Sequence, residues 1–173
     1  ELEDRVGAQL MPSARERHQA GRLDEAEAGY QEVLRLDPKH PDALHLLGLV
    51  ALQVGRNDAA VDLIGRAIAA KPSDPGYQNN LGLAYLALGQ SDKAITCLRA
   101  ALAIAPDFAD ANANLGIALH GKGSFGDAID CFRRAIAARP DFGEAYNGLG
   151  YALMSEGRMD EAVPCFQKAL AFN

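Results

Sequence analysis

The amino-acid sequence predicts an all-α protein, an α-solenoid built from five helix–turn–helix repeats. Two observations lead to this prediction. A glycine recurs every 34 residues, and an alanine follows each of these glycines after five residues. Between these markers apolar residues are spaced three and four apart, as on one face of a helix, without the period-two alternation of a strand. A single helical pair of this length cannot bury its apolar face, so the pairs are expected to stack.

The repeat is defined by four marker positions. The turn glycines are Gly21, Gly55, Gly89, Gly123 and Gly157, and the alanines are Ala26, Ala60, Ala94, Ala128 and Ala162. The bulky apolar residues four positions further on are Tyr30, Ile64, Leu98, Phe132 and Phe166, and the closing prolines are Pro38, Pro72, Pro106 and Pro140. Each glycine is expected to end the first helix of its unit in a left-handed conformation, and each proline to stop the second helix.

A Leu-Gly pair recurs inside the first helices, and its glycines are Gly48, Gly82, Gly116 and Gly150. Glycine inside a helix costs about 1 kcal/mol relative to alanine. Four such glycines in one register therefore predict a close approach of the neighbouring helix. The first unit departs from the pattern, because Pro12, Ser13 and Ala14 stand at this register. Its first helix is expected to be kinked or to begin late.

Two helix starts are marked by local signals. Pro75 follows Asp74, as a proline in the first turn of a helix would. Asp141 and Glu144 have the spacing of a capping box, in which the two side chains satisfy amides at the helix start.

These markers, in register through four units, closely resemble the tetratricopeptide repeat over residues 7–173. The resemblance implies a right-handed superhelix, with the first helices lining a concave groove and the second helices forming the convex back. The expected units are residues 1–40, a degenerate first repeat with an N-terminal helix, then 41–74, 75–108, 109–142 and 143–173. The last unit lacks a capping helix.

The resemblance also places candidate partner-binding residues in the groove. They are Leu49, Leu52, Asn79, Asn80, Leu83, Leu86, Asn114, Ile117, His120, Asn147, Tyr151 and Met154. Glu144 and Ser155 occupy further groove positions. The apolar members form a track that either contacts a partner or packs against neighbouring helices. The asparagines could pair with a peptide backbone, because an amide both donates and accepts, or could simply be common at this position.

The asparagine ladder is similar to that of O-linked N-acetylglucosamine transferases, and the segment from His40 to Gly48 resembles bacterial relatives of those enzymes. Two functions follow. The first is a protein-interaction scaffold that binds a peptide or a helix in the groove. The alternative is the substrate-recruiting region of a larger bacterial glycosyltransferase-like protein. The groove positions from the second repeat onward carry no Lys or Arg, which argues against the clamp that chaperone-binding repeats use for a C-terminal carboxylate.

Composition argues against several other classes. The formal charge is −6 and the pI is near 5.2, without a long Lys/Arg run, so nucleic acid is not expected as a partner. No apolar stretch reaches the length of a membrane span. The three cysteines, Cys97, Cys131 and Cys165, lie one period apart and are expected to be free thiols in a reducing cytoplasm. We expect no metal, no cofactor and no catalytic site.

Three further expectations concern the remaining surfaces. Gly121-Lys122-Gly123 matches a nucleotide-binding fingerprint by letters, but it falls at a turn after a helix instead of after a strand. Basic residues such as Arg66 and Arg133 on the second helices are expected to form a solvated face. The alternative is that this face binds an acidic partner. The last repeat ends without a cap, so either the sequence is part of a longer protein or this end packs on a second copy, and a homodimer through the C-terminal end is one of these two expectations.

Overall fold

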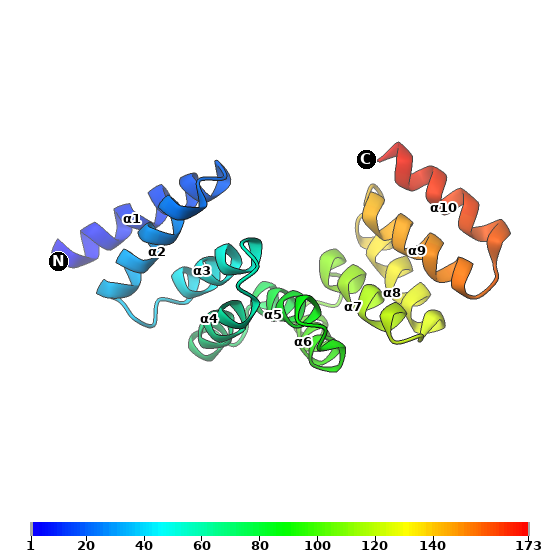
Figure 1. Cartoon of the computed structure of the whole chain (residues 1–173), viewed down its shortest axis with the longest axis horizontal. Helices are drawn as coiled ribbons and strands as arrows, with labels where there is room; N and C mark the ends of the chain where they lie inside the picture. The colour runs from blue at the N-terminus through cyan, green and yellow to red at the C-terminus, as the bar shows by residue number, and fades with distance from the viewer. Residues whose placement is uncertain (1, 173) are drawn as a thin grey trace. The chain divides into compact units, whose positions relative to one another are not determined.

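The structure is a computed structural model that describes residues 2–172, with side chains from residue 10 onward. This part of the chain contains ten α-helices and no strand, which confirms the all-α prediction (Figure 1). The helices are α1 (Leu2–Gln19), α2 (Leu23–Leu36), α3 (Pro41–Gln53), α4 (Asn57–Ala70), α5 (Pro75–Ala87), α6 (Ser91–Ile104), α7 (Ala109–Gly121), α8 (Phe125–Ala138), α9 (Gly143–Ser155) and α10 (Met159–Ala171).

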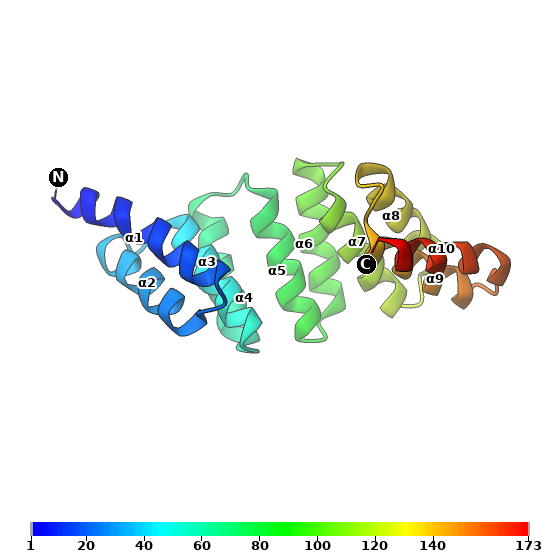
Figure 2. The same ribbon diagram turned by 90° about the horizontal axis from the view of Figure 1, so that it is seen from above.

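The helices form two compact units, unit 1 (Glu1–Ala84) and unit 2 (Tyr85–Asn173), which divide within α5. In unit 1, α1 packs on α2, α2 on α3, and α3 on α4. In unit 2, the consecutive helices from α6 to α10 pack on one another, and α7 also contacts α9 directly. Figures 1 and 2 both show α3 beside α4 and α9 beside α10, as expected of helical pairs. The contact between α7 and α9 brings first helices of successive repeats together.

The turn inside each pair depends on its glycine. All five turn glycines have a φ between 70° and 78°, which confirms the predicted left-handed conformation. At the second turn, the amide of Gly55 bonds to the carbonyl of Leu52 at 3.1 Å, and the amide of Arg56 bonds to that of Ala51 at 2.8 Å. These bonds satisfy the last carbonyls of α3. A residue with a Cβ would be strained at this φ, so the turn selects glycine.

Of the two helix-start signals that the sequence predicted, the one at Pro75 is confirmed. Helix α5 begins at Pro75, and the Asp74 carboxylate accepts a bond from the Gly76 amide at 3.0 Å, as expected of a first-turn proline. The predicted capping box is wrong. Helix α9 begins at Gly143, and its N-cap is Phe142, which makes no side-chain bond. Because the helix begins two residues after Asp141, the Glu144 side chain lies in its first turn and does not bond back to Asp141.

The glycines of the Leu-Gly pairs lie against bulky side chains of the second helices. A Cβ on Gly48 would be 2.6 Å from Ile64, one on Gly116 would be 2.9 Å from Phe132, and one on Gly150 would be 2.6 Å from Phe166. Real Cβ atoms do not approach other atoms so closely. The predicted packing need is therefore confirmed at these three glycines. Their missing side chains make room for the Ile or Phe marker of the same repeat.

The first repeat meets the same need in a different way. Helix α1 runs from Leu2 to Gln19 with Pro12 inside it, so the expected late start is wrong. Ala14 stands at the register of the glycine in the Leu-Gly pair and is fully buried. Here Gly29 on α2 supplies the close approach, because a Cβ on it would be 2.7 Å from the Cβ of Ala14. Burial of Ala14 against α2 explains why the helix continues past the proline.

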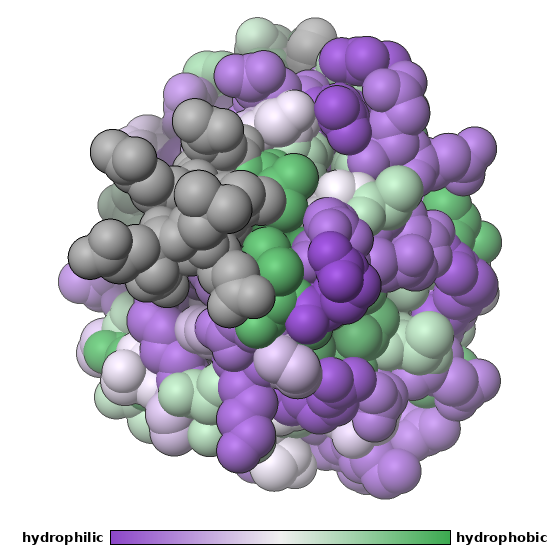
Figure 3. All heavy atoms as spheres, turned by 90° about the vertical axis from the view of Figure 1, so that its left-hand side faces the viewer, coloured by the Kyte–Doolittle hydropathy of each residue, from purple (hydrophilic) through white to green (hydrophobic). Residues whose placement is uncertain are grey.

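The apolar cores extend beyond single helical pairs, because each cluster joins helices of successive repeats. Unit 1 contains one cluster around Tyr30 and Leu47 and another around Leu44 and Ile64. Unit 2 contains a single larger cluster around Phe132. Seen from the side of unit 1 that carries α1, hydrophobic residues reach the surface in several places among hydrophilic side chains (Figure 3).

Three further observations concern the part of the chain that the structure describes. None of its helices is both long enough and apolar enough to cross a membrane. Cys97, Cys131 and Cys165 are free thiols on α6, α8 and α10, and burial raises the pKa of each. Among the described residues, no three His, Cys, Asp or Glu side chains gather where they could hold a metal ion.

Candidate functional site

A cleft of about 400 Å³ lies on unit 2 between α7 and α9. It brings together four residues that the sequence analysis proposed for the groove, namely Ile117, His120, Asn147 and Tyr151. Phe132, Glu144 and Gly148 complete its lining. The direct contact of α7 with α9 is what places these side chains on one surface.

The Phe132 ring forms the floor of the cleft. It reaches the cleft from α8, with only 2% of its surface exposed. A Cβ on Gly148 would be 2.4 Å from the ring, and one on Gly116 would be 2.9 Å from it. The two glycines therefore open a path for the ring between the first helices. Sequence reasoning placed Phe132 in the core and missed its part in the cleft. Gly148 was a signal for it, because the two preceding repeats carry an asparagine at the same position, Asn80 and Asn114.

The walls of the cleft are apolar and exposed. Ile117 on α7 is 53% exposed, and Tyr151 on α9 is 48% exposed. The Tyr151 ring packs edge-on against Phe166 with the ring centroids 5.2 Å apart, which limits its movement. Met154, one turn further along α9, is 40% exposed. Exposed large apolar side chains that gather on one surface are typical of an interaction site.

A histidine and an amide provide the polar groups of the cleft. His120 Nε2 lies 3.0 Å from Ser155 Oγ, whose hydroxyl donates to the Tyr151 carbonyl at 3.0 Å. With its proton directed to that carbonyl, Ser155 Oγ can accept a bond from His120 Nε2. Asn147 is exposed and offers both a donor and an acceptor. The cleft thus combines apolar walls with an amide that is suited to a peptide backbone.

The charge around the cleft is negative. Asp110 accepts a bond from Arg139 at 2.7 Å, and this bond raises the pKa of the guanidinium, which Asp141 and Glu144 raise further. The Arg139 guanidinium also stacks over the Phe142 ring, 4.3 Å from its centroid. One guanidinium therefore faces three carboxylates, and Glu144 is the carboxylate that lines the cleft.

The predicted leucines are less exposed than the residues of the cleft. Leu49, Leu52 and Leu83 of unit 1 and Leu86 of unit 2 are all half-buried. Leu52 packs against the second core cluster of unit 1, and Leu86 against the core of unit 2. For Leu52 and Leu86, packing against neighbouring helices accounts for part of the apolar surface. Their role in partner binding stays a prediction.

The predicted asparagines of unit 1 bond within that unit. Asn79 is 5% exposed, and its amide donates to Asn80 Oδ1 at 3.1 Å. The Asn80 amide in turn lies 2.8 Å from His45 Nε2. Since this amide nitrogen only donates, Nε2 accepts, and His45 is neutral in this arrangement. Asn114, on α7 of unit 2, is half-buried.

A polar network surrounds His45 that sequence reasoning did not find. The Tyr77 hydroxyl donates to the Asp42 carboxylate, and this bond lowers the pKa of Asp42. Arg15 bonds the same carboxylate at 3.1 Å. Burial lowers the pKa of His45, whose ring lies 4.4 Å from that of Tyr77. Asp74 and Asp42 oppose this shift, whereas Arg15 and Lys71 add to it. The bonded pairs come from different repeats, with Arg15 27 positions from Asp42 and Tyr77 35 positions from it, so periodicity alone did not connect them.

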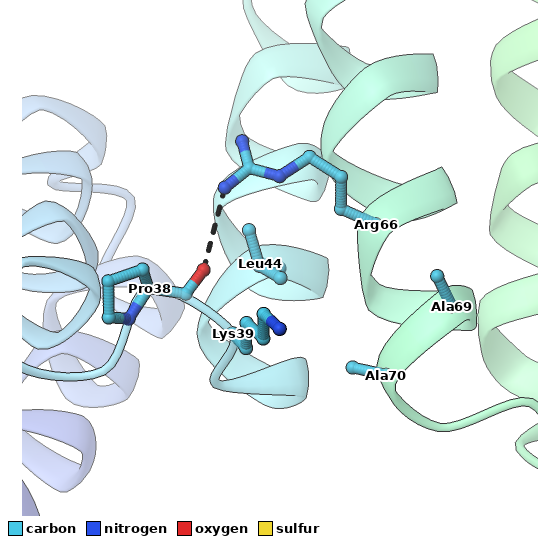
Figure 4. A pocket seen from close by; sticks show the side chains of 6 residues that line it. All are labelled: Pro38, Lys39, Leu44, Arg66, Ala69 and Ala70. Carbon is cyan, nitrogen blue, oxygen red and sulfur yellow. Dashed lines mark hydrogen bonds between the residues drawn. The ribbon is translucent and has the colours of Figure 1, made fainter.

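A second cavity, of about 420 Å³, lies in unit 1 beside the loop that joins α2 to α3 (Figure 4). Leu44, Ala69 and Ala70 form its apolar part, and Lys39 and Arg66 its basic part. Arg66 donates to the Pro38 carbonyl at 3.5 Å, as the dashed line in Figure 4 shows, and pairs with Asp62 at 3.6 Å. Arg66 is exposed on its second helix, in line with the expected solvated basic face.

Three models of the tetratricopeptide repeat match the chain. Two that are described as "Tetratricopeptide repeat" match residues 17–82 and 121–173, and one that is described as "TPR repeat" matches residues 82–123. Together the matches extend from residue 17 to residue 173. They confirm the tetratricopeptide repeats that the marker positions predicted.

Solved structures share this fold. The crystal structure of MamA matches with 28% sequence identity and a TM-score of 0.80, and the match covers 92% of this chain and 93% of the MamA chain. A MamA structure from Desulfovibrio magneticus RS-1 is 21% identical over 96% of this chain and 94% of its own, with a TM-score of 0.83. YrrB, a TPR protein with an unusual peptide-binding site, is 21% identical over 95% of this chain and 84% of its own, with a TM-score of 0.73.

Among curated proteins, cellulose synthase operon protein C of Komagataeibacter xylinus is 48% identical over 50 residues. This match covers 29% of the chain but only 4% of that much longer protein. The similarity therefore concerns a short stretch of repeats and does not extend to the rest of the operon protein.

Proposed function

This chain is a tetratricopeptide-repeat protein, and we propose that it works as a protein-interaction scaffold that binds a peptide in the cleft between α7 and α9. The observation that supports this proposal is the exposure of Ile117 and Tyr151 on the two walls of the cleft. Burying both side chains against a partner would remove their apolar surface from water, at roughly 25 cal/mol for each Å². Asn147 between them could bond the backbone of the bound peptide.

The similar proteins are consistent with this role. YrrB, which shares the fold, is a TPR protein with a peptide-binding site. The alternative role, recruitment of substrates for a glycosyltransferase-like enzyme, was inferred from the asparagine ladder. In unit 1, Asn79 bonds Asn80, and Asn80 bonds His45. These internal bonds occupy the two unit 1 members of the ladder, whereas Asn147 of unit 2 is exposed in the cleft. The bonds in unit 1 therefore do not favour the alternative over a scaffold.

The proposal can be tested with peptides selected from a random library on the immobilised protein. The affinity of the best peptide would then be measured by fluorescence anisotropy for the wild type and for the variant Ile117→Ser plus Tyr151→Ser. Both side chains are about half exposed, so their replacement is expected to preserve the fold. We expect the affinity to fall at least about tenfold, which corresponds to the loss of roughly 1.4 kcal/mol.

The matched control is Ile104→Ser on α6. Ile104 is 43% exposed and does not line the cleft, so its replacement also removes exposed apolar surface. This control is expected to leave the affinity unchanged, and circular dichroism would establish that all variants remain helical. Equal affinities for the wild type and the double variant would refute binding in the cleft.

We also propose self-association through α10. Its outward side chains include Val163, Leu170 and Phe172, which are 47%, 79% and 47% exposed. A second copy that packs on this face would bury them. Sedimentation over a range of concentrations tests this proposal, and a constant monomer mass at high concentration would contradict it.

The free thiols suit a reducing compartment such as the cytoplasm.

A further inference from the structure

We infer that the peptide for this cleft carries an apolar residue and, two positions away, a lysine or arginine. This inference rests on the proposed function, and it adds the charge and spacing of the partner. The apolar residue would lie between Ile117 and Tyr151 over the Phe132 ring, and the basic residue would bond Glu144. Each of these four residues lines the cleft.

The first argument is charge. The seven residues that line the cleft include one carboxylate, Glu144, and neither Lys nor Arg. The nearby guanidinium of Arg139 does not neutralise this end of the cleft, because it bonds Asp110 at 2.7 Å and also faces Asp141 and Glu144. Three carboxylates around one guanidinium leave two negative charges in excess. A cationic side chain is therefore attracted to this position, and an anionic one is repelled.

The second argument is the accessibility of Glu144. It is exposed in the first turn of α9. The helix does not use it as a capping group, because the N-cap, Phe142, makes no side-chain bond. A partner can reach its carboxylate without breaking a cap.

The third argument is spacing. Seven residues separate Glu144 from Tyr151, which corresponds to about 10 Å along the axis of α9. In an extended peptide, residues two apart point to the same face and are about 7 Å apart. The flexible four-carbon stem of lysine covers the remaining few ångströms. Asn147 lies between the two ends of this track, so its amide is placed to bond the peptide backbone between the two side chains.

The test uses short, terminally blocked peptides of otherwise neutral sequence. One carries leucine with lysine two positions away, and two others replace this lysine with glutamine or glutamate. A fourth keeps the lysine but replaces leucine with serine. Binding to the whole chain is measured by fluorescence anisotropy at about 0.01 M salt, where charges are weakly screened. We expect the lysine peptide to bind about threefold more tightly than the glutamine peptide and about tenfold more tightly than the glutamate peptide.

Two variants connect this preference to one carboxylate. Glu144→Gln is expected to abolish the difference between the lysine and glutamine peptides. Asp160→Asn is the matched control, because Asp160 is also an exposed acidic residue in the first turn of a helix, α10, but does not line the cleft. This control is expected to keep the threefold preference, which should shrink toward unity at about 1 M salt.

The outcomes separate this inference from the proposed function. If the lysine, glutamine and glutamate peptides bind equally well, and all bind more tightly than the serine peptide, the charge inference is wrong while the scaffold proposal stands. A lysine preference that survives Glu144→Gln would also overturn the inference. If the serine peptide binds as tightly as the leucine peptide, the apolar part of the inference fails. If none of the four binds, although library-selected peptides still require Ile117 and Tyr151, only the inference fails.

Discussion

Replacing Gly148 with alanine is expected to destabilise unit 2, although alanine is the better helix former. Gly148 lies within α9, where exchange to alanine would ordinarily gain up to about 1 kcal/mol. Its new Cβ would be 2.4 Å from Cε1 and 2.5 Å from Cζ of the Phe132 ring. Ordinary contacts of a Cβ begin at 3.4 Å, so the ring or the helix must move by about 1 Å.

The ring has little room for such a movement. Phe132 is 2% exposed, and on its other side it lies against Gly116, where an added Cβ would be 2.9 Å away. Overpacking of a well-packed core costs typically about 1–3 kcal/mol. A movement of about 1 Å places the cost near the upper end of this range, about 3 kcal/mol. When the gain in helix propensity of up to about 1 kcal/mol is set against it, the free energy of unfolding should fall by about 2 kcal/mol.

The assay is urea denaturation, followed by far-ultraviolet circular dichroism, with hydrogen exchange to locate the loss. Protection should fall in α8 and α9 first, because repeat proteins can lose structure locally. The control is Gly65→Ala on α4, where an added Cβ meets no atom within 4 Å. This control should be neutral or more stable than the wild type. If Gly148→Ala is also as stable as the wild type, the close packing of Gly148 on Phe132 is not what requires a glycine there.

Two further predictions concern the polar network of unit 1. Tyr77→Phe removes the hydroxyl that lowers the pKa of Asp42, and should cost about 1 kcal/mol at pH 7, less than a buried charged bond because Asp42 is 41% exposed. This loss should be present above the unfolded-state pKa of Asp42, about 3.9, and shrink as the pH falls through its lower folded-state pKa. A pH series of urea midpoints would reveal this trend. If wild type and variant lose stability in acid in the same way, the prediction is contradicted. Because burial lowers the pKa of His45 below its unfolded value of about 6.5, the stability from neutral His45 should be complete above that pH and decline as the pH falls through the folded-state pKa. His45→Gln keeps an acceptor for Asn80 and should flatten this decline between about pH 7 and pH 5, and a decline of the same size in the variant would assign it to other groups.

Much of the fold could be read from the spacing of residues. The turn glycines, such as Gly55 and Gly123, predicted where first helices end, because a left-handed residue at that point selects glycine. The glycines of the Leu-Gly pairs predicted close helix packing, and in the structure Ile64 and Phe132 lie against them. The packing of the irregular first repeat could not be predicted from this register. There the glycine that allows the close approach is Gly29 on the second helix, and position 14 on the first helix is an alanine.

The candidate site was only partly predictable. The family register placed Ile117, His120, Asn147 and Tyr151 on groove positions, with Glu144 on a further one, and the structure brings all five to one cleft. The register did not predict that Phe132 would form the floor, because a core ring becomes part of a cleft only when it passes far enough between two helices. Nor did it predict that Asn80 would bond His45 from the preceding repeat.

The repeat pattern by itself determined the helices, their turns and the order in which they pair, because these depend on local backbone preferences and on a periodic apolar face. The tertiary structure alone decided which groove residues remain exposed and which are used for packing. Leu83 and Ile117 occupy the same position of successive repeats, yet Leu83 is half-buried and Ile117 is 53% exposed. The physical reason is that exposure depends on side chains contributed by neighbouring helices, and this information is not present in the spacing of any single repeat.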